Sequence, residues 1–183
     1  MPERFGLISE DNSDIEVIRK ILLNYFDDSD FSVKKFVGNG CGKIKQKCAA
    51  WTENLLKRGC DHVLIFHDSD NNPTDIIRTL LQNKLGNHCE AVIIIPIQEI
   101  EAWLLSDANA IRTTFNLKRT PKKIHNTESI ISPKEYLRDL VWRHGRKPYI
   151  NTIHNARIAE NIALSNFRRC PSFRPLHNYL VSI

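Results

Sequence analysis

Two closely spaced carboxylates follow an apolar run in the first half of this 183-residue chain. Residues 63 to 66 are Val-Leu-Ile-Phe, and Asp68 and Asp70 come shortly after them. If the strand continues through the pair, side chains two residues apart point to the same face, roughly 6–7 Å from each other. Like charges so placed repel each other unless a cation lies beside them. Because hard oxygen ligands suit Mg²⁺ or Mn²⁺, the pair predicts a metal site.

Further acidic residues follow two other apolar runs. Glu10 comes after residues 5–9, and Glu99 and Glu101 come after residues 91–97. In an open parallel sheet the carboxyl ends of the strands share one edge, and ligands bind there. We therefore expect these side chains to converge with the Asp pair.

The two glutamates are not equivalent if residues 99–105 form a helix. They would then diverge by about 200°, so that only one faces the site. We favour Glu101 as the metal ligand and keep Glu99 as the alternative.

The elements that must position these residues alternate along the first 115 residues. Apolar runs predict strands at 5–9, 31–37, 63–66 and 91–97. Helical spacing predicts helices at 15–23 (with Asn12 or Ser13 as N-cap), 43–57, 73–84, 99–105, 133–142, 150–164 and 173–180. This alternation predicts an α/β fold with a mostly parallel four-stranded sheet flanked by helices. Because the strand pattern fades after residue 115, we expect a metal-binding domain at 1–115 and a basic helical subdomain at 116–183.

The net charge of +5 hides a division between these two parts. Residues 1–111 carry 12 Lys and Arg against 17 Asp and Glu, whereas residues 112–183 carry 14 against 4. A basic segment beside an acidic one is typical of nucleic-acid binding, although a solvated basic surface would give the same count.

Composition excludes several other classes of protein. No stretch approaches the ~20 apolar residues of a membrane span, and the start of the chain lacks a signal peptide's apolar region. The five cysteines are scattered without a CxxC pair, which favours a reduced, cytoplasmic protein and argues against a zinc site.

Several cations of the sequence are candidates for binding phosphates. They come from a glycine-rich turn, from the start of a predicted helix, from a cluster beside Trp142 and Tyr149, and from a segment near the C-terminus. They are Lys43, Lys134, Arg143, Arg146, Lys147, Arg168 and Arg169. Arginine and aromatic side chains together suit phosphates and unstacked bases.

The order of an acidic turn followed by a DxD pair resembles the TOPRIM fold, the metal-binding domain of primases, topoisomerases and OLD-family nucleases. The matching segments are residues 8–14, Ile-Ser-Glu-Asp-Asn-Ser-Asp, and residues 67–70, His-Asp-Ser-Asp. Asp11 stands where that family usually has glycine.

Most of the chain is also similar to small bacterial TOPRIM-like proteins that are often encoded beside ATPases in defence loci. The shared segments are a glycine-rich turn (38–43), an acidic segment that runs into a helix (96–107), a Ser-Pro-Lys stretch (132–137) and a Cys-Pro-x-Phe element (170–173).

These resemblances imply a Mg²⁺- or Mn²⁺-dependent nuclease that cleaves DNA or RNA as an effector of anti-phage defence, and they suggest an ATPase as its partner. Glu10, Asp68, Asp70 and Glu101 would be catalytic, and with Glu99 they would bind metal. Two alternatives remain open. One is a non-catalytic nucleic-acid-binding or regulatory subunit; the other is a response-regulator-like or phosphatase-like domain.

Overall fold

The computed structural model describes residues 2–86, 88 and 90–183. Within these ranges it contains an all-parallel sheet of strand order β2-β1-β3-β4. The strands are β1 (Glu3–Ser9), β2 (Phe31–Val37), β3 (His62–Phe66) and β4 (Val92–Ile94). The predicted α/β class with a four-stranded parallel sheet is therefore confirmed.

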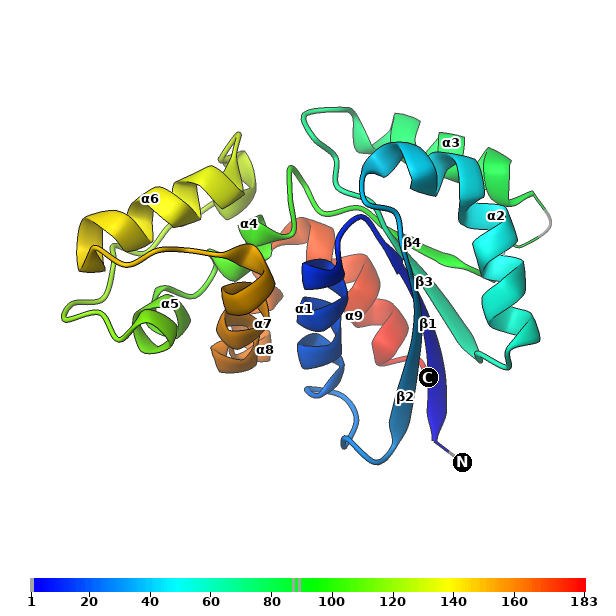
Figure 1. Ribbon diagram of the computed structural model, residues 1–183, viewed down its shortest axis with the longest axis horizontal. Helices are drawn as coiled ribbons and strands as arrows, with labels where there is room; N and C mark the ends of the chain where they lie inside the picture. The colour runs from blue at the N-terminus through cyan, green and yellow to red at the C-terminus, as the bar shows by residue number, and fades with distance from the viewer. Residues whose placement is uncertain (1, 87, 89) are drawn as a thin grey trace.

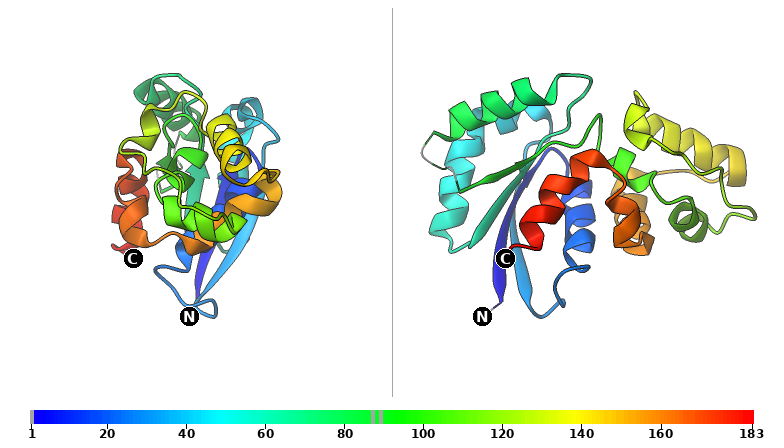
Figure 2. Two further views of the ribbon diagram at one scale, coloured as in Figure 1. Left: turned by 90° about the vertical axis from the view of Figure 1, so that its left-hand side faces the viewer. Right: turned by 180° about the vertical axis from the view of Figure 1, so that it is seen from behind.

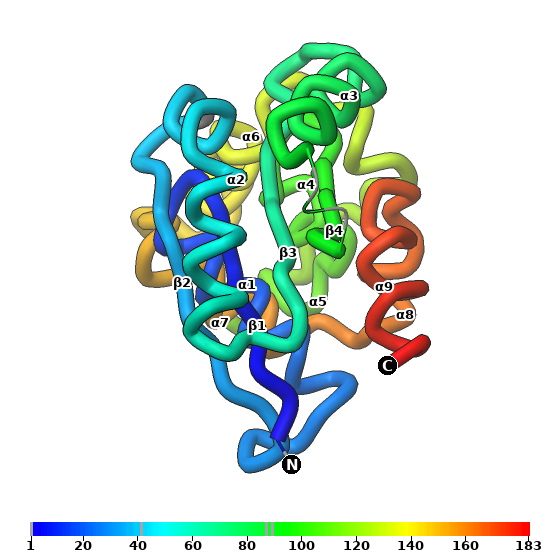
Figure 3. Tube along the Cα trace, turned by 90° about the vertical axis from the view of Figure 1, so that its right-hand side faces the viewer, coloured from blue at the N-terminus to red at the C-terminus, as the bar shows by residue number. Residues whose placement is uncertain are grey.

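Helices cover both faces of the sheet. On one face lie α1 (Asn12–Leu22) and α9 (Arg174–Leu180), and on the other lie α2 (Cys41–Lys57) and α3 (Thr74–Leu85), as Figures 1 and 2 show. Figure 3 views the molecule from the side of α2. This placement follows from the strand order, because right-handed crossovers put the β1–β2 helix on one face and the next two helices on the other.

Alternating side chains of the strands supply a core to each face. In β1, Phe5 and Leu7 pack with α1 while Ile8 packs with α2 and α3, and β3 and β4 alternate in the same way. Helix α2 approaches β1 closely at Gly6, where a Cβ atom would lie 2.9 Å from Leu55 Cδ1.

The remaining helices extend the α1 side of the molecule. They are α4 (Glu101–Leu104), α5 (Ala108–Phe115), α6 (Pro133–Gly145), α7 (Asn151–Asn161) and α8 (Leu164–Phe167), with 3-10 turns at Thr127–Ser129 and Pro171–Phe173. Helix α7 packs on α1, and α6 points away from the sheet (Figure 1). Phe167 and Phe173 belong to the same buried cluster as Phe5, so residues 116–183 share a core with residues 1–115.

Several element boundaries differ from the predicted ones. The fourth strand is shorter, because Pro96 cannot donate to the ladder, and it ends at Ile94. The expected 150–164 helix is divided into α7 and α8 by extended backbone at Ile162 and Ala163. In the part of the chain that the structure describes, no helix has both the length and the apolar character that crossing a bilayer requires.

Candidate active site

The reversal of strand order lies between β1 and β3, where ligands bind in open α/β sheets. The chain leaves β1 for α1 on one face and leaves β3 for α3 on the other. Glu10 follows β1 and Asp68 follows β3, and the Asp68 backbone N–H donates to Glu10 Oε1 at 3.3 Å. The two carboxylates therefore flank the switch point directly.

An acidic pocket of about 240 Å³ opens at this edge. It is lined by Glu10, Asp11, Ser13, Asp14, Asn39, Gly40, Asp68, Asp70, Glu99, Glu101, Lys134 and Asn151. The five carboxylates that were expected to converge are all among these residues. They come from loops that follow β1, β3 and β4, and from the start of α4.

Asp68 and Asp70 lie on a loop, so the prediction that strand geometry aligns them is wrong. The loop backbone turns left-handed at Asp70, with φ of 46°. Its position is fixed by the loop after β4: Ser69 N–H donates to the Pro96 carbonyl at 3.1 Å, and Gln98 N–H donates to Ser69 Oγ at 2.7 Å. These bonds hold the DxD loop beside the loop that carries Glu99.

Asp14 is a pocket carboxylate that the sequence analysis did not select. Asp11 is the N-cap of α1, in place of the expected Asn12 or Ser13, and its side chain accepts from Ser13 N–H at 2.9 Å. Asp14 Oδ2 accepts from Asp11 N–H at 3.0 Å, which completes a capping box. The Asp-x-x-Asp spacing was the available signal for this arrangement. The φ of Asp11 is −126°, an extended conformation that does not require glycine.

Glu101 is held by two residues of the C-terminal half. Asn155 Nδ2 donates to Glu101 Oε1 at 2.9 Å. The single Tyr149 O–H is shared between the same oxygen, at 3.2 Å, and Asn155 Oδ1, at 2.5 Å. Glu101 is only 4% exposed and Asn155 is fully buried. Both donors lie about fifty residues away in the sequence, so no local spacing could have revealed them.

Glu99 precedes helix α4, which begins at Glu101, so the expected helical divergence of the two glutamates does not occur. Both line the pocket. Glu99 Oε2 accepts from the backbone N–H of Lys134 at 2.8 Å and thus satisfies one of the free amides at the start of α6.

Burial and mutual repulsion raise the pKa of several pocket carboxylates. The pKa of Glu10 rises to about 7 through burial and the charge of Asp70. The pKa of Asp14 also rises to about 7, mainly through burial, with a contribution from Glu101. Burial and four neighbouring carboxylates raise the pKa of Asp68 well above its usual range. The pocket therefore concentrates negative charge that its own residues do not balance.

The donor chemistry of the pocket fits a hard divalent cation. Carboxylate oxygens are the preferred ligands of Mg²⁺, and the Asp68 carboxylate receives no hydrogen bond from any residue that the structure describes. In the same described residues, however, no three His, Cys, Asp or Glu side chains are already arranged to hold an ion. Binding would therefore require the pocket side chains to draw together around the cation.

Two lysines, Lys134 and Lys45, lie near the acidic pocket, whereas the predicted Lys43 does not line it. Lys134 is one of its lining residues. Lys43 is exposed on the first turn of α2 and does not line the pocket. Lys45, which the sequence analysis did not select, is close enough to lower the pKa of Glu10 against the effects of burial and Asp70.

The other predicted phosphate-binding residues do not line the pocket. Arg143, Arg146 and Lys147 lie at the far end of α6. Arg168 is exposed near Tyr25, and it lowers the Tyr25 pKa against the larger effect of burial. The Arg169 guanidinium donates to two backbone carbonyls, those of Ser106 and Ile124, and so ties loops together.

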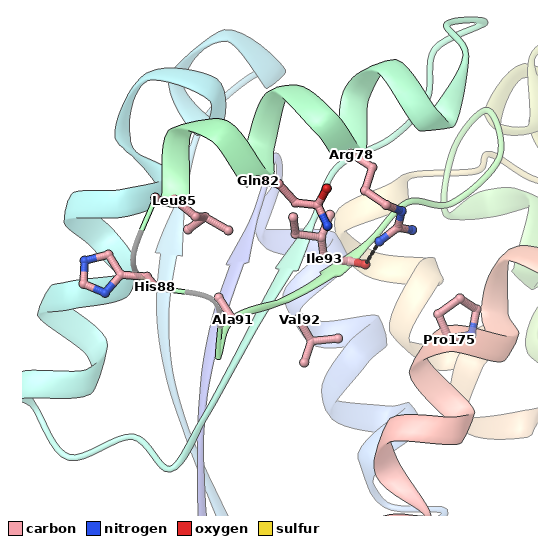
Figure 4. Close-up of a pocket in the computed structure, with 9 residues that line it drawn as sticks. Arg78, Gln82, Leu85, His88, Ala91, Val92, Ile93 and Pro175 are labelled. Atoms are coloured by element: carbon pink, nitrogen blue, oxygen red, sulfur yellow. Dashed lines mark hydrogen bonds between the residues drawn. The ribbon is translucent and has the colours of Figure 1, made fainter.

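A larger pocket of about 420 Å³ lies beside the edge strand β4 (Figure 4). Arg78 Nη1 donates there to the Ile93 carbonyl at 2.9 Å, and Gln82 and Pro175 also line the space. Its described lining residues include no carboxylate. Of these two pockets, only the smaller one at the switch point has carboxylates among its described lining residues.

Comparison with known proteins places the chain in a family. A family model described as a domain of unknown function, DUF4276, matches residues 9–181. No curated protein and no solved structure matches the chain significantly. The match includes every residue that lines the acidic pocket and continues through the C-terminal helices. The chain belongs to the DUF4276 family.

Proposed function

We propose that the acidic pocket binds Mg²⁺ or Mn²⁺ and that the protein hydrolyses phosphodiester bonds in nucleic acid. One observation carries this proposal. Four carboxylates, those of Glu10, Asp14, Asp70 and Glu101, act on Asp68, whose own carboxylate has no donor among the described residues. A pocket that accumulates so much repulsion is explained by a cation that relieves it.

The residues would divide the work as follows. Glu10, Asp68, Asp70 and Glu101 would hold the cation, which would neutralise charge on the phosphate. Alternatively, Glu10 would accept the proton of the attacking water instead of holding the cation. The water oxygen would bond to phosphorus as the ester oxygen leaves and takes a proton from solvent. Lys134 would offset charge on the phosphoryl oxygens.

The test is the change Asp68→Asn, measured in two ways. Titration calorimetry with Mn²⁺ should show binding to the wild type and none to the variant. In EDTA the variant should melt at a higher temperature than the wild type, because it lacks a carboxyl group whose ionisation is opposed by burial and by four neighbouring carboxylates. Asp28→Asn, at an exposed loop, is the matched control and should bind Mn²⁺ normally.

Cleavage is measured on DNA and RNA with Mg²⁺ or Mn²⁺. Wild-type cleavage that disappears in EDTA and in Asp68→Asn supports the proposal, whereas cleavage that survives both contradicts it. A wild type that binds no Mn²⁺ would favour the alternative, a non-catalytic subunit beside an ATPase. The resemblance to defence-associated proteins makes phage challenge of cells with and without the Asp68→Asn variant the test of a defence role.

A further inference from the structure

A row of four residues runs from the acidic pocket along α6. Lys134, Arg138 and Trp142 are spaced by four in α6, and each step turns only about 40° around the helix. Arg146 follows directly after the helix, with a φ of 51°, and continues the row through its contact with Trp142. Lys134 lines the pocket, and Trp142 lies about 12 Å farther along the axis. We call these four residues the α6 row.

Trp142 is the unusual member of this row. Its side chain is 50% exposed, whereas Trp103 is fully buried and Trp51 stacks on Phe36. The guanidinium of Arg146 lies over the Trp142 ring, 5.6 Å from its centroid. An exposed indole beside an arginine is a surface on which a planar group can stack.

The surroundings of Trp142 are strongly basic. Residues 108–147 carry ten Lys and Arg against three Asp and Glu. Leu117 meets the end of α6, since a Cβ on Gly145 would lie 2.6 Å from Leu117 Cδ2. This contact brings the loop that follows Leu117 to the end of the α6 row. The cations of this region that have no carboxylate within 4.0 Å among the described residues include Lys118, Arg119, Lys122, Lys123, Arg143, Arg146 and Lys147.

We infer that the α6 row is a track for single-stranded nucleic acid, with an unpaired base stacked on Trp142 and the backbone led toward Lys134. This inference rests on the proposed function and names its substrate class. A base in a duplex has both faces covered by its neighbours, so only an unpaired base offers a free face to the indole. The surrounding cations suit a polyanion, and they do not distinguish DNA from RNA.

The test measures binding in EDTA, so that no metal-dependent cleavage interferes. Fluorescence anisotropy is recorded with labelled 20-nucleotide single strands of DNA and of RNA, and with the matching blunt duplexes. Trp142→Ala and Trp142→Leu should weaken single-strand binding roughly 5- to 150-fold, as expected for one lost base stack. Trp142→Phe keeps a ring and should stay within about threefold of the wild type.

Two controls separate stacking from other effects. Lys57→Ala removes an exposed cation at the end of α2 and should leave the affinity unchanged. Single strands should quench the tryptophan emission of the wild type more than that of Trp142→Phe, because Trp51 and Trp103 remain in both. Equal melting temperatures of the variants show that folding is intact.

The outcomes distinguish this inference from the nuclease proposal. If Trp142→Ala binds single strands as tightly as the wild type, or if the wild type prefers duplexes, the track is overturned whatever the enzyme cleaves. If binding depends on Trp142 but no metal-dependent cleavage occurs, the track stands and the nuclease proposal fails. A wild type that binds no nucleic acid at low salt overturns the track, and the cleavage assay with metal then decides the nuclease proposal.

Discussion

At the scale of single residues, the pocket is defined by carboxylates that are costly to ionise together. Seven of them line it beside one lysine: Glu10, Asp11, Asp14, Asp68, Asp70, Glu99 and Glu101. Glu101 and Glu99 have hydrogen-bond donors, whereas Asp68 has none among the described residues. Asp68 thus combines four repelling neighbours with no donor, so a cation beside it would lower the free energy of the folded state.

Replacing Glu10 with Gln should make this cost measurable as a function of pH. The folded pKa of Glu10 is about 7 against an ordinary 4.5, so the native state binds more protons between these values. Wild-type stability contributed by this group is therefore greatest below pH 4.5 and falls as pH rises through 7. Without metal, Glu10→Gln should gain about 2–3 kcal/mol relative to the wild type between pH 4.5 and pH 8.

Urea denaturation in EDTA across this range gives the difference between the two proteins. Burial lowers the pKa of the neighbouring His67, which acts in the opposite direction, but His67 is present in both proteins and largely cancels. Glu160→Gln, an exposed change on α7, serves as the control. A difference between Glu10→Gln and the wild type that does not vary with pH would contradict the elevated pKa of Glu10.

At the scale of elements, helix α7 connects the C-terminal half to the pocket. Asn155 and, just before the helix, Tyr149 donate to Glu101, while Asn151 Nδ2 donates to Ser13 Oγ of α1 at 3.4 Å. Helix α7 also packs along α1. Helix α7 therefore helps to position Glu101 but contributes no carboxylate of its own to the pocket lining.

Asn155→Ala should weaken both folding and metal binding. Loss of the donor leaves a buried carboxylate with one partner, which costs about 1–3 kcal/mol of stability. As a positioning residue, Asn155 should also affect Mn²⁺ affinity, by 10- to 100-fold in calorimetry. Asn161→Ala, at the other end of α7, should leave that affinity unchanged. An Asn155→Ala protein that is destabilised yet binds Mn²⁺ normally would limit Asn155 to a structural role.

The same elements show what could be predicted from sequence. Strand and helix alternation identified the sheet, and residues that follow parallel strands necessarily reach one edge, so Glu10 and Asp68 were found. The position of Asp14 in the pocket depends on a capping box that it forms with Asp11, another acidic residue. Tyr149 and Asn155 depend on how α7 packs against α1, which periodicity does not encode. The segment of Asp68 and Asp70 was expected to continue the strand. It is a loop because it bonds to the loop after β4, and the sequence around the two aspartates does not reveal these long-range bonds.

At the scale of the molecule, residues 1–115 and 116–183 build one core on the α1 face of the sheet. Phe167, Phe173 and Leu176 are fully buried in the cluster that contains Phe5 and Ile18. The family model likewise spans both segments, from residue 9 to residue 181.

A fragment of residues 1–115 should therefore fail to fold cooperatively. Without the C-terminal helices, the side of α1 that packs on α7 and the part of the sheet that α9 covers would be exposed to water. Thermal unfolding followed by near-UV circular dichroism should show a transition for the full chain and none for the fragment. A sharp transition for the fragment would show that it is an independent domain.

The length of α6 has a consequence for how a polyanion reaches the pocket. Trp142 is about 12 Å from Lys134 along the helix, which exceeds the Debye length of about 8 Å at physiological ionic strength. There the outer cations attract a strand with little interference from the carboxylates. At about 0.01 M salt the screening length grows to roughly 30 Å, so that the attraction by the outer cations and the repulsion by the pocket carboxylates both extend over the whole row. Binding of a strand to the outer cations and its entry into the acidic pocket would thus be separate events. Ionic strength would change how strongly the pocket carboxylates oppose the first of them.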